Sequence, residues 1–150
     1  NGSKPVVVEQ LMKEGLVDRI ALDVKAPLEA DSYERVIDLP GSGEAMVASV
    51  ERTLDLSNSF GVEVEVRTTV APTVSDEPEF IRKIASRIRS RCDEYHLQQF
   101  DNMGEVLSPR LRELPSPSRE TMANLAAIAV REGVTSVFIK TREFGLERIG

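Results

Sequence analysis

The chain has 150 residues, of which 41% are hydrophobic and 29% are charged, and its net charge is −6 at pH 7. This composition is typical of one globular domain, and the acidic balance argues against a duplex nucleic-acid binder, because phosphate binding requires a basic surface. No apolar run approaches the ~20 residues of a membrane-spanning helix, so no membrane association is expected and the protein is expected to be cytoplasmic.

Helical and strand periods alternate along the chain. Four helices are expected, over residues 4–14, over 44–60, from about residue 77, and from 118 to 133. Four strands are expected, over residues 18–25, 62–70, 94–100 and 134–140. Ser3 and Ser118 are predicted to cap the first and last helices, and Gly61 to end the second. Strands that alternate with helical crossovers predict an α/β fold with a parallel sheet.

Basic residues lie within and just after the helix that begins near Glu77: Arg82, Lys83, Arg87, Arg89 and Arg91. Its apolar residues recur at helical spacing on another face: Ile81, Ile84, Ala85 and Ile88. This pattern favours a solvated basic face over a nucleic-acid site. In the last helix the same reasoning predicts a buried face of Met122, Leu125, Ala126 and Ala129.

Cysteine and histidine, the side chains that usually hold zinc and iron–sulfur centres, are few in this chain. The chain has one cysteine, Cys92, and one histidine, His96. A single cysteine cannot form an intrachain disulfide, and these two side chains cannot by themselves supply a zinc or iron–sulfur centre. We predict a structural role for Cys92 and favour one for His96, which lies near the start of its strand.

Ligands of parallel α/β sheets bind at the carboxyl ends of the strands. In the first strand the period of two places Asp23 and Lys25 on one face, at that end. A carboxylate and an ammonium at this spacing suit a zwitterionic ligand such as an amino acid. A structural ion pair is an equally good interpretation of the spacing alone.

In the second strand Glu63, Glu65, Arg67 and Thr69 share one face, and the valines share the other. Arg67 and Thr69 lie towards the carboxyl end, where a ligand is expected. A solvent-facing sheet would show a similar pattern. The sequence contains no nucleophile elbow, phosphate-binding loop or dinucleotide fingerprint.

Four segments resemble, in order, segments of the activating enzymes of the radical S-adenosylmethionine (SAM) superfamily. They are residues 1–5 (NGSKP), 22–25 (LDVK), 66–72 (VRTTVAP) and 95–100 (YHLQQF). The resemblance covers residues 1–110 and is strongest to the activating proteins of anaerobic ribonucleoside-triphosphate reductase.

The resemblance implies that residues 1–110 form the C-terminal half of a partial (β/α)6 TIM-like barrel, with residues 111–150 as a helix–strand extension. It also implies the cofactors SAM and a 4Fe-4S cluster. In the family the cluster cleaves SAM reductively to generate a glycyl radical on a partner enzyme. The implied partners are a glycyl-radical enzyme, foremost anaerobic ribonucleoside-triphosphate reductase, and an electron donor.

The resemblance further implies roles for individual residues. Lys25 would meet the methionine carboxylate of SAM, and Asp23 would orient Lys25 or the amino group. Arg67 and Thr69 would lie near the nucleoside part of SAM. Asn1 and Ser3 would lie at the neighbouring strand end. These six residues are the expected cofactor-binding set.

The chain departs from the family pattern in several places. It lacks the Cys-x3-Cys-x2-Cys motif and the Gly-Gly-Glu stretch, so we expect a chain that is inactive alone because the cluster-binding segment is missing. Phe100 stands where some activating enzymes carry histidine, and Thr73 follows Pro72 where relatives have glycine. Two alternatives remain open: a radical SAM enzyme acting on a small molecule or peptide, and a cluster-free binding module.

Overall fold

The computed structural model describes residues 2–103, 106 and 108–150. Five strands form a single sheet in the order β1-β2-β3-β4-β5. Their bounds are β1 (Arg19–Asp23), β2 (Glu63–Val70), β3 (Glu94–Gln99), β4 (Val137–Thr141) and β5 (Gly145–Arg148). The first four strands are parallel, and β5 pairs with β4 in the antiparallel direction. The predicted α/β fold with a parallel sheet is confirmed.

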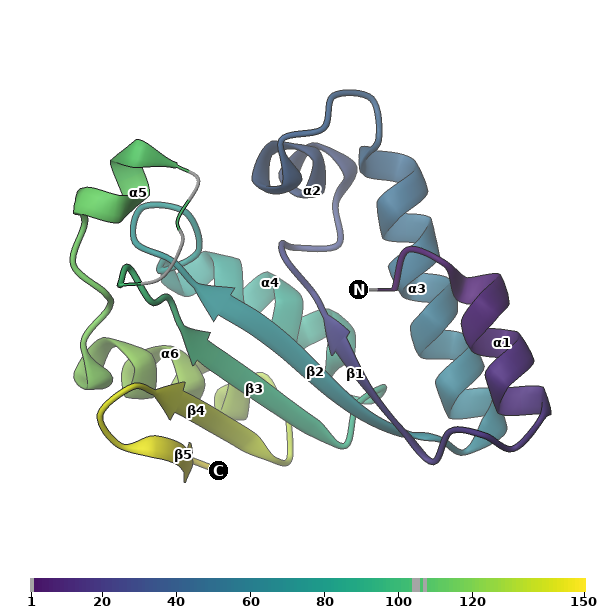
Figure 1. The fold of residues 1–150 in the computed structure, drawn as a ribbon. Helices are drawn as coiled ribbons and strands as arrows, with labels where there is room; N and C mark the ends of the chain where they lie inside the picture. The colour runs from purple at the N-terminus through teal and green to yellow at the C-terminus, as the bar shows by residue number, and fades with distance from the viewer. Residues whose placement is uncertain (1, 104–105, 107) are drawn as a thin grey trace.

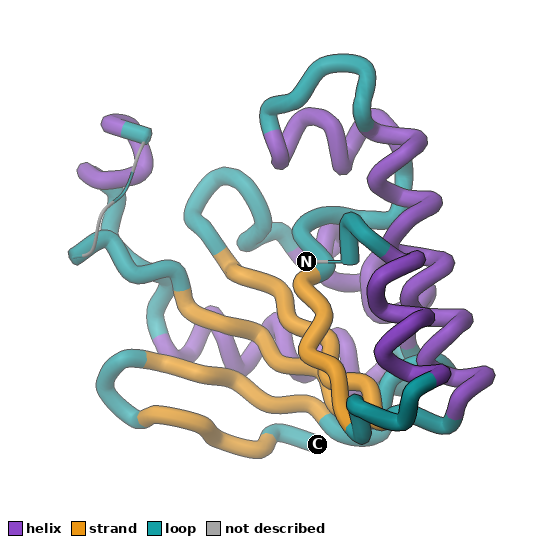
Figure 2. The backbone as a smooth tube through the Cα atoms, turned by 45° about the vertical axis from the view of Figure 1, so that its right-hand side comes forward, coloured by secondary structure: helices purple, strands orange, loops and turns teal. Residues whose placement is uncertain are grey.

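One helix precedes β1, and the others described lie in the connections between the parallel strands. Their bounds are α1 (Pro5–Lys13), α2 (Ala30–Ile37), α3 (Gly43–Phe60), α4 (Pro78–Ile88), α5 (Pro109–Glu113) and α6 (Arg119–Arg131). In Figure 1, α4 and α6 lie behind the sheet, whereas α1 and α3 lie beside β1. Figure 2 shows the strands as one layer with the long helices behind and beside it. The helices thus leave the front face of the sheet uncovered.

The core lies between the sheet and the long helices. Leu22, Val66, Tyr95 and Val137 form one row across four strands, because each is the register partner of the next. All four are buried. The helices contribute a second layer of fully buried side chains: Val50, Leu54, Ile81, Ile84, Ala85, Ile88, Met122 and Ala126. Burial of these apolar groups is the main force that holds the helices on this face.

The opposite face of the sheet is rich in polar side chains. Glu65, Arg67, His96 and Gln98 alternate with the buried residues along β2 and β3, as the period of a strand requires. Charged side chains on a strand face that no helix covers are usual for the inner wall of an enzyme barrel or for a solvated sheet. The described strands form an open sheet rather than a closed barrel.

Most elements match their predicted positions to within two residues. The helix over 44–60 is α3, and Gly61 ends it with a φ of 67°. The Ser118 hydroxyl accepts a hydrogen bond from the Thr121 amide and caps α6 as predicted. The four predicted core residues of α6 are its buried residues, and the four of α4 are the buried residues of that helix.

The structure differs from the predicted elements in three parts of the chain. Lys4, not Ser3, is the N-cap of α1, and Pro5 begins the helix without a side-chain cap. The segment after Pro27 contains the helix α2, which ends at Asp38 in the left-handed conformation (φ 52°). The last predicted strand, residues 134–140, begins only at Val137. It is followed by a further strand, β5, which was not predicted because its residues show no clear alternating pattern.

The helices of the described chain are too short or too polar to cross a lipid bilayer.

Candidate ligand-binding site

A pocket of about 210 Å³ lies where β1 and β2 end. Its lining includes four of the six predicted site residues: Asp23, Lys25, Arg67 and Thr69. The remaining lining residues are Val24, Val36, Ala71, Val74 and Ser75. They come from the end of β1, from α2 and from the turn after β2. The carboxyl edge of the parallel strands therefore brings together groups that are more than 40 residues apart in the chain.

Asp23 and Lys25 form an ion pair on one side of the pocket. Lys25 Nζ lies 3.8 Å from Asp23 Oδ2, and both side chains are about half exposed. Lys25 lies two residues beyond Asp23, the last residue of β1, so the strand is shorter than the predicted 18–25. An exposed pair of this length contributes little to stability. Both groups are thus accessible to a ligand that carries the complementary charges.

Two hydrogen bonds hold the backbone around Lys25. The Val24 amide donates to the Arg67 carbonyl at 2.8 Å, which extends the β1–β2 ladder past Asp23. The Lys25 amide donates to the hydroxyl oxygen of Tyr33 at 3.2 Å. Tyr33 is 1% exposed, and burial raises its pKa. Sequence reasoning missed Tyr33 because it lies in the unpredicted helix α2.

The turn after β2 forms the opposite wall of the pocket. The buried Ser75 hydroxyl donates to the Thr69 carbonyl at 2.7 Å and accepts from the Ala71 amide at 2.8 Å. Within this turn Thr73 has a φ of 63°. This is the position at which the sequence resembles a Pro-Gly turn, and the positive φ explains why glycine suits it.

Arg67 reaches the pocket from the polar face of the sheet. Its Nε donates to Glu65 Oε1 at 2.5 Å. Asp23 is the register partner of Arg67, so a carboxylate and a guanidinium stand at the same level of neighbouring strands. Together with Lys25, the pocket offers two cations and one carboxylate beside the apolar side chains of Val36 and Val74.

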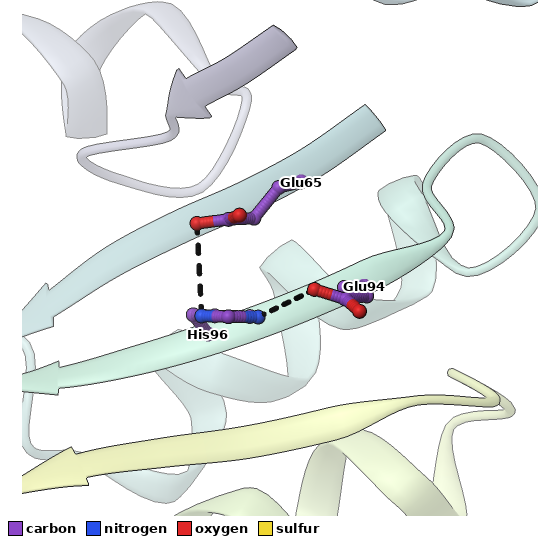
Figure 3. A group of neighbouring side chains, drawn as sticks. All are labelled: Glu65, Glu94 and His96. Atoms are coloured by element: carbon purple, nitrogen blue, oxygen red, sulfur yellow. Dashed lines mark hydrogen bonds and ion pairs between the residues drawn. The ribbon is translucent and has the colours of Figure 1, made fainter. Parts of the chain in front are cut away.

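Further from the pocket, Glu65, Glu94 and His96 form a cluster on the polar face (Figure 3). His96 Nε2 is 2.9 Å from Glu94 Oε2, and His96 Nδ1 is 3.6 Å from Glu65 Oε1. Arg19 donates to both carboxylates at 2.6 Å. Burial disfavours the charge on Glu65, but hydrogen bonds from Arg67 and Arg19 outweigh it and lower its pKa.

The predicted structural roles of His96 and Cys92 agree with their surroundings. His96 is 7% exposed, and its ring packs on Phe138 with 4.8 Å between the ring centroids. Burial, with a smaller effect of Asp93, raises the pKa of the Cys92 thiol to about 12. Such a thiol is almost fully protonated at neutral pH and is a poor metal ligand. The described residues therefore do not fit a 4Fe-4S cluster.

Two predicted site residues stand apart from this pocket. Asn1 lies outside the described residues, and Ser3 is described but does not line the pocket. Gly2 lies close to β1, because a Cβ built on it would come within 2.6 Å of Leu22 Cδ1. Gly2 therefore packs against the side chain of Leu22 in β1.

The basic face of α4 is tied into surface ion pairs. Arg87 and Arg91 both bind Glu51 of α3, and Lys83 binds Glu29. The pairs of Arg87 and Lys83 connect α4 to neighbouring elements, and Arg91 lies just after the helix. The apolar residues of α4 are buried as predicted, and Arg82, Lys83, Arg87 and Arg89 are exposed.

No protein-family model matches the chain. Its sequence is 34% identical, over 141 residues, to a protein of Methanocaldococcus jannaschii that is named as a glycyl-radical enzyme activating enzyme. The match covers 94% of this chain and 56% of that protein. The chain thus spans about half the length of the curated relative that it matches.

Two solved structures share the fold. One is a domain of pyruvate-formate lyase-activating enzyme from Bacteroides vulgatus, with a TM-score of 0.65 and 14% identity over 91% of this chain and 74% of that one. The other is a radical SAM methyltransferase from Sphaerobacter thermophilus, with a TM-score of 0.64 and 16% identity over 91% of this chain and 37% of that one. The chain is therefore similar in sequence, over most of its length, to a protein named as a glycyl-radical enzyme activating enzyme, and it shares its fold with these two solved structures.

Proposed function

We propose that the pocket at the ends of β1 and β2 binds SAM, and that the chain is the C-terminal part of a radical SAM activating enzyme. One observation carries this proposal: Asp23, Lys25, Arg67 and Thr69 line a single pocket at the carboxyl edge of parallel strands. A zwitterionic ligand needs a cation for its carboxylate and an anion for its amino group, and Lys25 and Asp23 are such a pair.

In this proposal each side chain has one task. Lys25 Nζ binds the methionine carboxylate, while Asp23 orients Lys25 or accepts from the ligand's amino group. Arg67 and Thr69 face the nucleoside part. Asn1 and Ser3 are proposed to bind SAM as well, as the family resemblance implies, although Ser3 does not line this pocket and Asn1 lies outside the described residues. The apolar side chains of Val36 and Val74 border the pocket, where they would exclude water from part of the ligand.

The residues of this chain provide only the binding half of the reaction. SAM, when bound to a reduced 4Fe-4S cluster, supplies the radical chemistry that abstracts a hydrogen atom. The 150 residues hold a single cysteine, and we propose that the Cys-x3-Cys-x2-Cys ligands are supplied from outside them. We propose that residues 1–110 belong to the barrel core and that residues 111–150 extend it, since β4 and β5 continue the same sheet.

The proposed partners are a glycyl-radical enzyme, in the first place anaerobic ribonucleoside-triphosphate reductase, and an electron donor, all in the cytoplasm. The name of the archaeal relative supports the class of partner. Copurification of the cluster-bearing protein with the reductase tests its identity. Recovery of another glycyl-radical enzyme, or radical transfer only to a small molecule or peptide, would contradict the choice of reductase.

The direct test is SAM binding to the Lys25→Ala variant, measured by calorimetry in protein that carries the cluster. Loss of a charged hydrogen bond predicts an affinity lower by about 1–3 kcal/mol. Lys83→Ala is a matched control, because Lys83 is equally exposed but pairs with Glu29 on another surface. Equal affinities of Lys25→Ala and wild type would remove Lys25 from the site.

The 150-residue chain alone is expected to produce no 5′-deoxyadenosine from SAM after reconstitution with iron and sulfide. Chromatography of the reaction mixture measures this product. Its formation by the isolated chain would overturn the proposal that the cluster ligands lie elsewhere.

A further inference from the structure

We infer that Glu65 is a positioning residue, which holds the guanidinium group of Arg67 at the pocket through a network anchored by Arg19, Glu94 and His96. This inference rests on the proposed function, because it assumes that Arg67 contacts the ligand. It adds a residue that neither the sequence pattern nor the family resemblance assigned to the site.

The Glu65 carboxylate is bound on two sides. Its Oε1 accepts from Arg67 Nε at 2.5 Å, and its Oε2 accepts from Arg19 Nη2 at 2.6 Å. The Glu65 side chain is 10% exposed, whereas those of Arg67 and Arg19 are 38% and 41% exposed. A buried carboxylate between two guanidinium groups has little rotational freedom. Because Arg67 Nε is hydrogen-bonded to this carboxylate, the Arg67 guanidinium is restricted as well.

A second set of contacts holds Glu65 in place. Glu65 and Glu94 are register partners on adjacent strands, and both accept hydrogen bonds from Nη2 of Arg19. His96 lies between the two carboxylates (Figure 3), and its ring is packed on Phe138. His96 is also the register partner of Arg67. The network therefore connects rigid positions of β1, β2 and β3 rather than loops.

The orientation of the hydrogen bond decides which nitrogens of Arg67 remain for a ligand. Nε is bound to Glu65, and within the described part of the chain Nη1 and Nη2 have no hydrogen-bond partner. A guanidinium held through Nε keeps its two terminal nitrogens as a fork for planar acceptors. Preorganisation of this kind raises affinity, because a mobile arginine loses conformational entropy when it binds.

Glu65, Glu94 and His96 are residue types that bind metal ions, and their potential ligand atoms all lie within 4.8 Å of one another. Arg19 and Arg67 already neutralise the two carboxylates, however, and Arg19 donates to both of them. A divalent cation would have to displace a guanidinium from between the glutamates. The geometry therefore points to an ion-pair network that serves Arg67.

A double-mutant cycle tests the inference. SAM affinity is measured by calorimetry for wild type, Glu65→Gln, Arg67→Ala and the double variant, in protein that carries the cluster. Arg67→Ala is expected to weaken binding at least as much as Glu65→Gln, which is expected to weaken it by about 5- to 20-fold. Because Glu65 acts through Arg67, Glu65→Gln should cause no further loss in the Arg67→Ala background.

The matched control is Glu63→Gln. Glu63 also pairs with Arg19, at 2.6 Å, but its side chain is 45% exposed and it makes no hydrogen bond to Arg67. The affinity of the Glu63→Gln variant for SAM should equal that of wild type. Additive losses for Glu65→Gln and Arg67→Ala, or an equal loss in Glu63→Gln, would overturn the positioning role. Glu65→Asp replaces Glu65→Gln if the latter does not fold.

A measurement without ligand separates this inference from the proposed function. In 15N NMR spectra of the 150-residue chain, the Nε–H signal of Arg67 should be protected from exchange with water in wild type and lose protection in Glu65→Gln. Unchanged protection would overturn the inference even if SAM binds. If Arg67→Ala binds SAM as wild type does, Arg67 is not a ligand-binding residue, and both the inference and that part of the proposed function fail.

Discussion

The hydroxyl of Thr68 donates a hydrogen bond at 2.8 Å to the carbonyl of Val24, a residue that lines the pocket. The hydroxyl of Tyr95 donates in turn to Thr68 Oγ1 at 3.0 Å. Thr68 and Tyr95 are 1% and 0% exposed. These two hydrogen bonds link β3 through β2 to Val24, the residue before Lys25. They therefore hold the chain in place just after β1, where the backbone hydrogen bonds of the sheet end.

We therefore expect Tyr95→Phe to lower the free energy of unfolding by about 1–2 kcal/mol, since it removes a buried donor and keeps the ring. Urea denaturation followed by circular dichroism measures the change. Thr68→Ser retains the hydroxyl and should lose less than Thr68→Val. Equal stability of Tyr95→Phe and wild type would mean that the hydrogen bond contributes nothing.

Thr73 is expected to be a site at which glycine stabilises the protein. Its φ of 63° lies in the left-handed region, which costs a residue with a Cβ about 1 kcal/mol or more. Glycine removes this strain but loses more conformational entropy on folding than threonine does. The net effect of Thr73→Gly should be a free energy of unfolding that is higher by about 0.5–1 kcal/mol. Thr73→Ala keeps the Cβ and is the control that should show no such gain.

Acid should weaken the network on the polar face of the sheet. Burial opposes the charges of Glu65 and Glu94, but hydrogen bonds from arginine and histidine outweigh it, so both pKa values lie below the ordinary 4.5. A carboxyl group with a lowered folded pKa contributes stability that is fully present above pH 4.5 and is lost as the pH falls through the folded pKa.

The pH dependence can be measured as the free energy of unfolding from pH 7 to pH 3. Glu65→Gln should be less stable than wild type at pH 7 and should lose less stability on acidification. If its curve runs parallel to that of wild type, Glu65 does not titrate with a lowered pKa.

Cys92 is expected to be unreactive in the folded protein. Burial, assisted by Asp93, raises the pKa of its thiol to about 12, and only the thiolate reacts with alkylating reagents. Iodoacetamide at pH 8 should modify the native chain on the order of 100-fold more slowly than the urea-unfolded chain. Mass spectrometry of quenched samples measures both rates, and similar rates would show that the thiol is accessible and ionised.

Strong local patterns were sufficient to predict the long elements. The strict alternation of residues 62–70 identified β2, and helical spacing of apolar residues identified the buried faces of α4 and α6. The weaker predictions failed for local reasons. The helix α2 has eight residues and follows a proline-containing turn, and β5 has four residues, so neither carries a long periodic signal.

The candidate site divides in the same way. Asp23, Lys25, Arg67 and Thr69 were predicted from strand periodicity, because the period of two decides which side chains share a face. Tyr33, Ser75 and Glu65 were assigned their tasks only by the structure. The hydroxyls of Tyr33 and Ser75 bind backbone groups of the pocket, and Glu65 binds Arg67. No spacing in the sequence distinguishes such residues from other buried or paired polar residues.

The sequence by itself thus determined the alternation of helices and strands, the buried faces and the polar residues at the strand ends, since all of these follow from local periodicity. Only the tertiary structure decided the strand order, the left-handed turn at Thr73 and the pairing of Arg67 with Glu65 and of Glu65 with Arg19. The strand order and the pairing of Glu65 with Arg19 depend on the register of strands that are distant in the chain, and register is set by how the whole sheet packs against its helices. The turn at Thr73 and the pairing of Arg67 with Glu65 involve nearby residues, but hydrophobic periodicity does not encode their geometry.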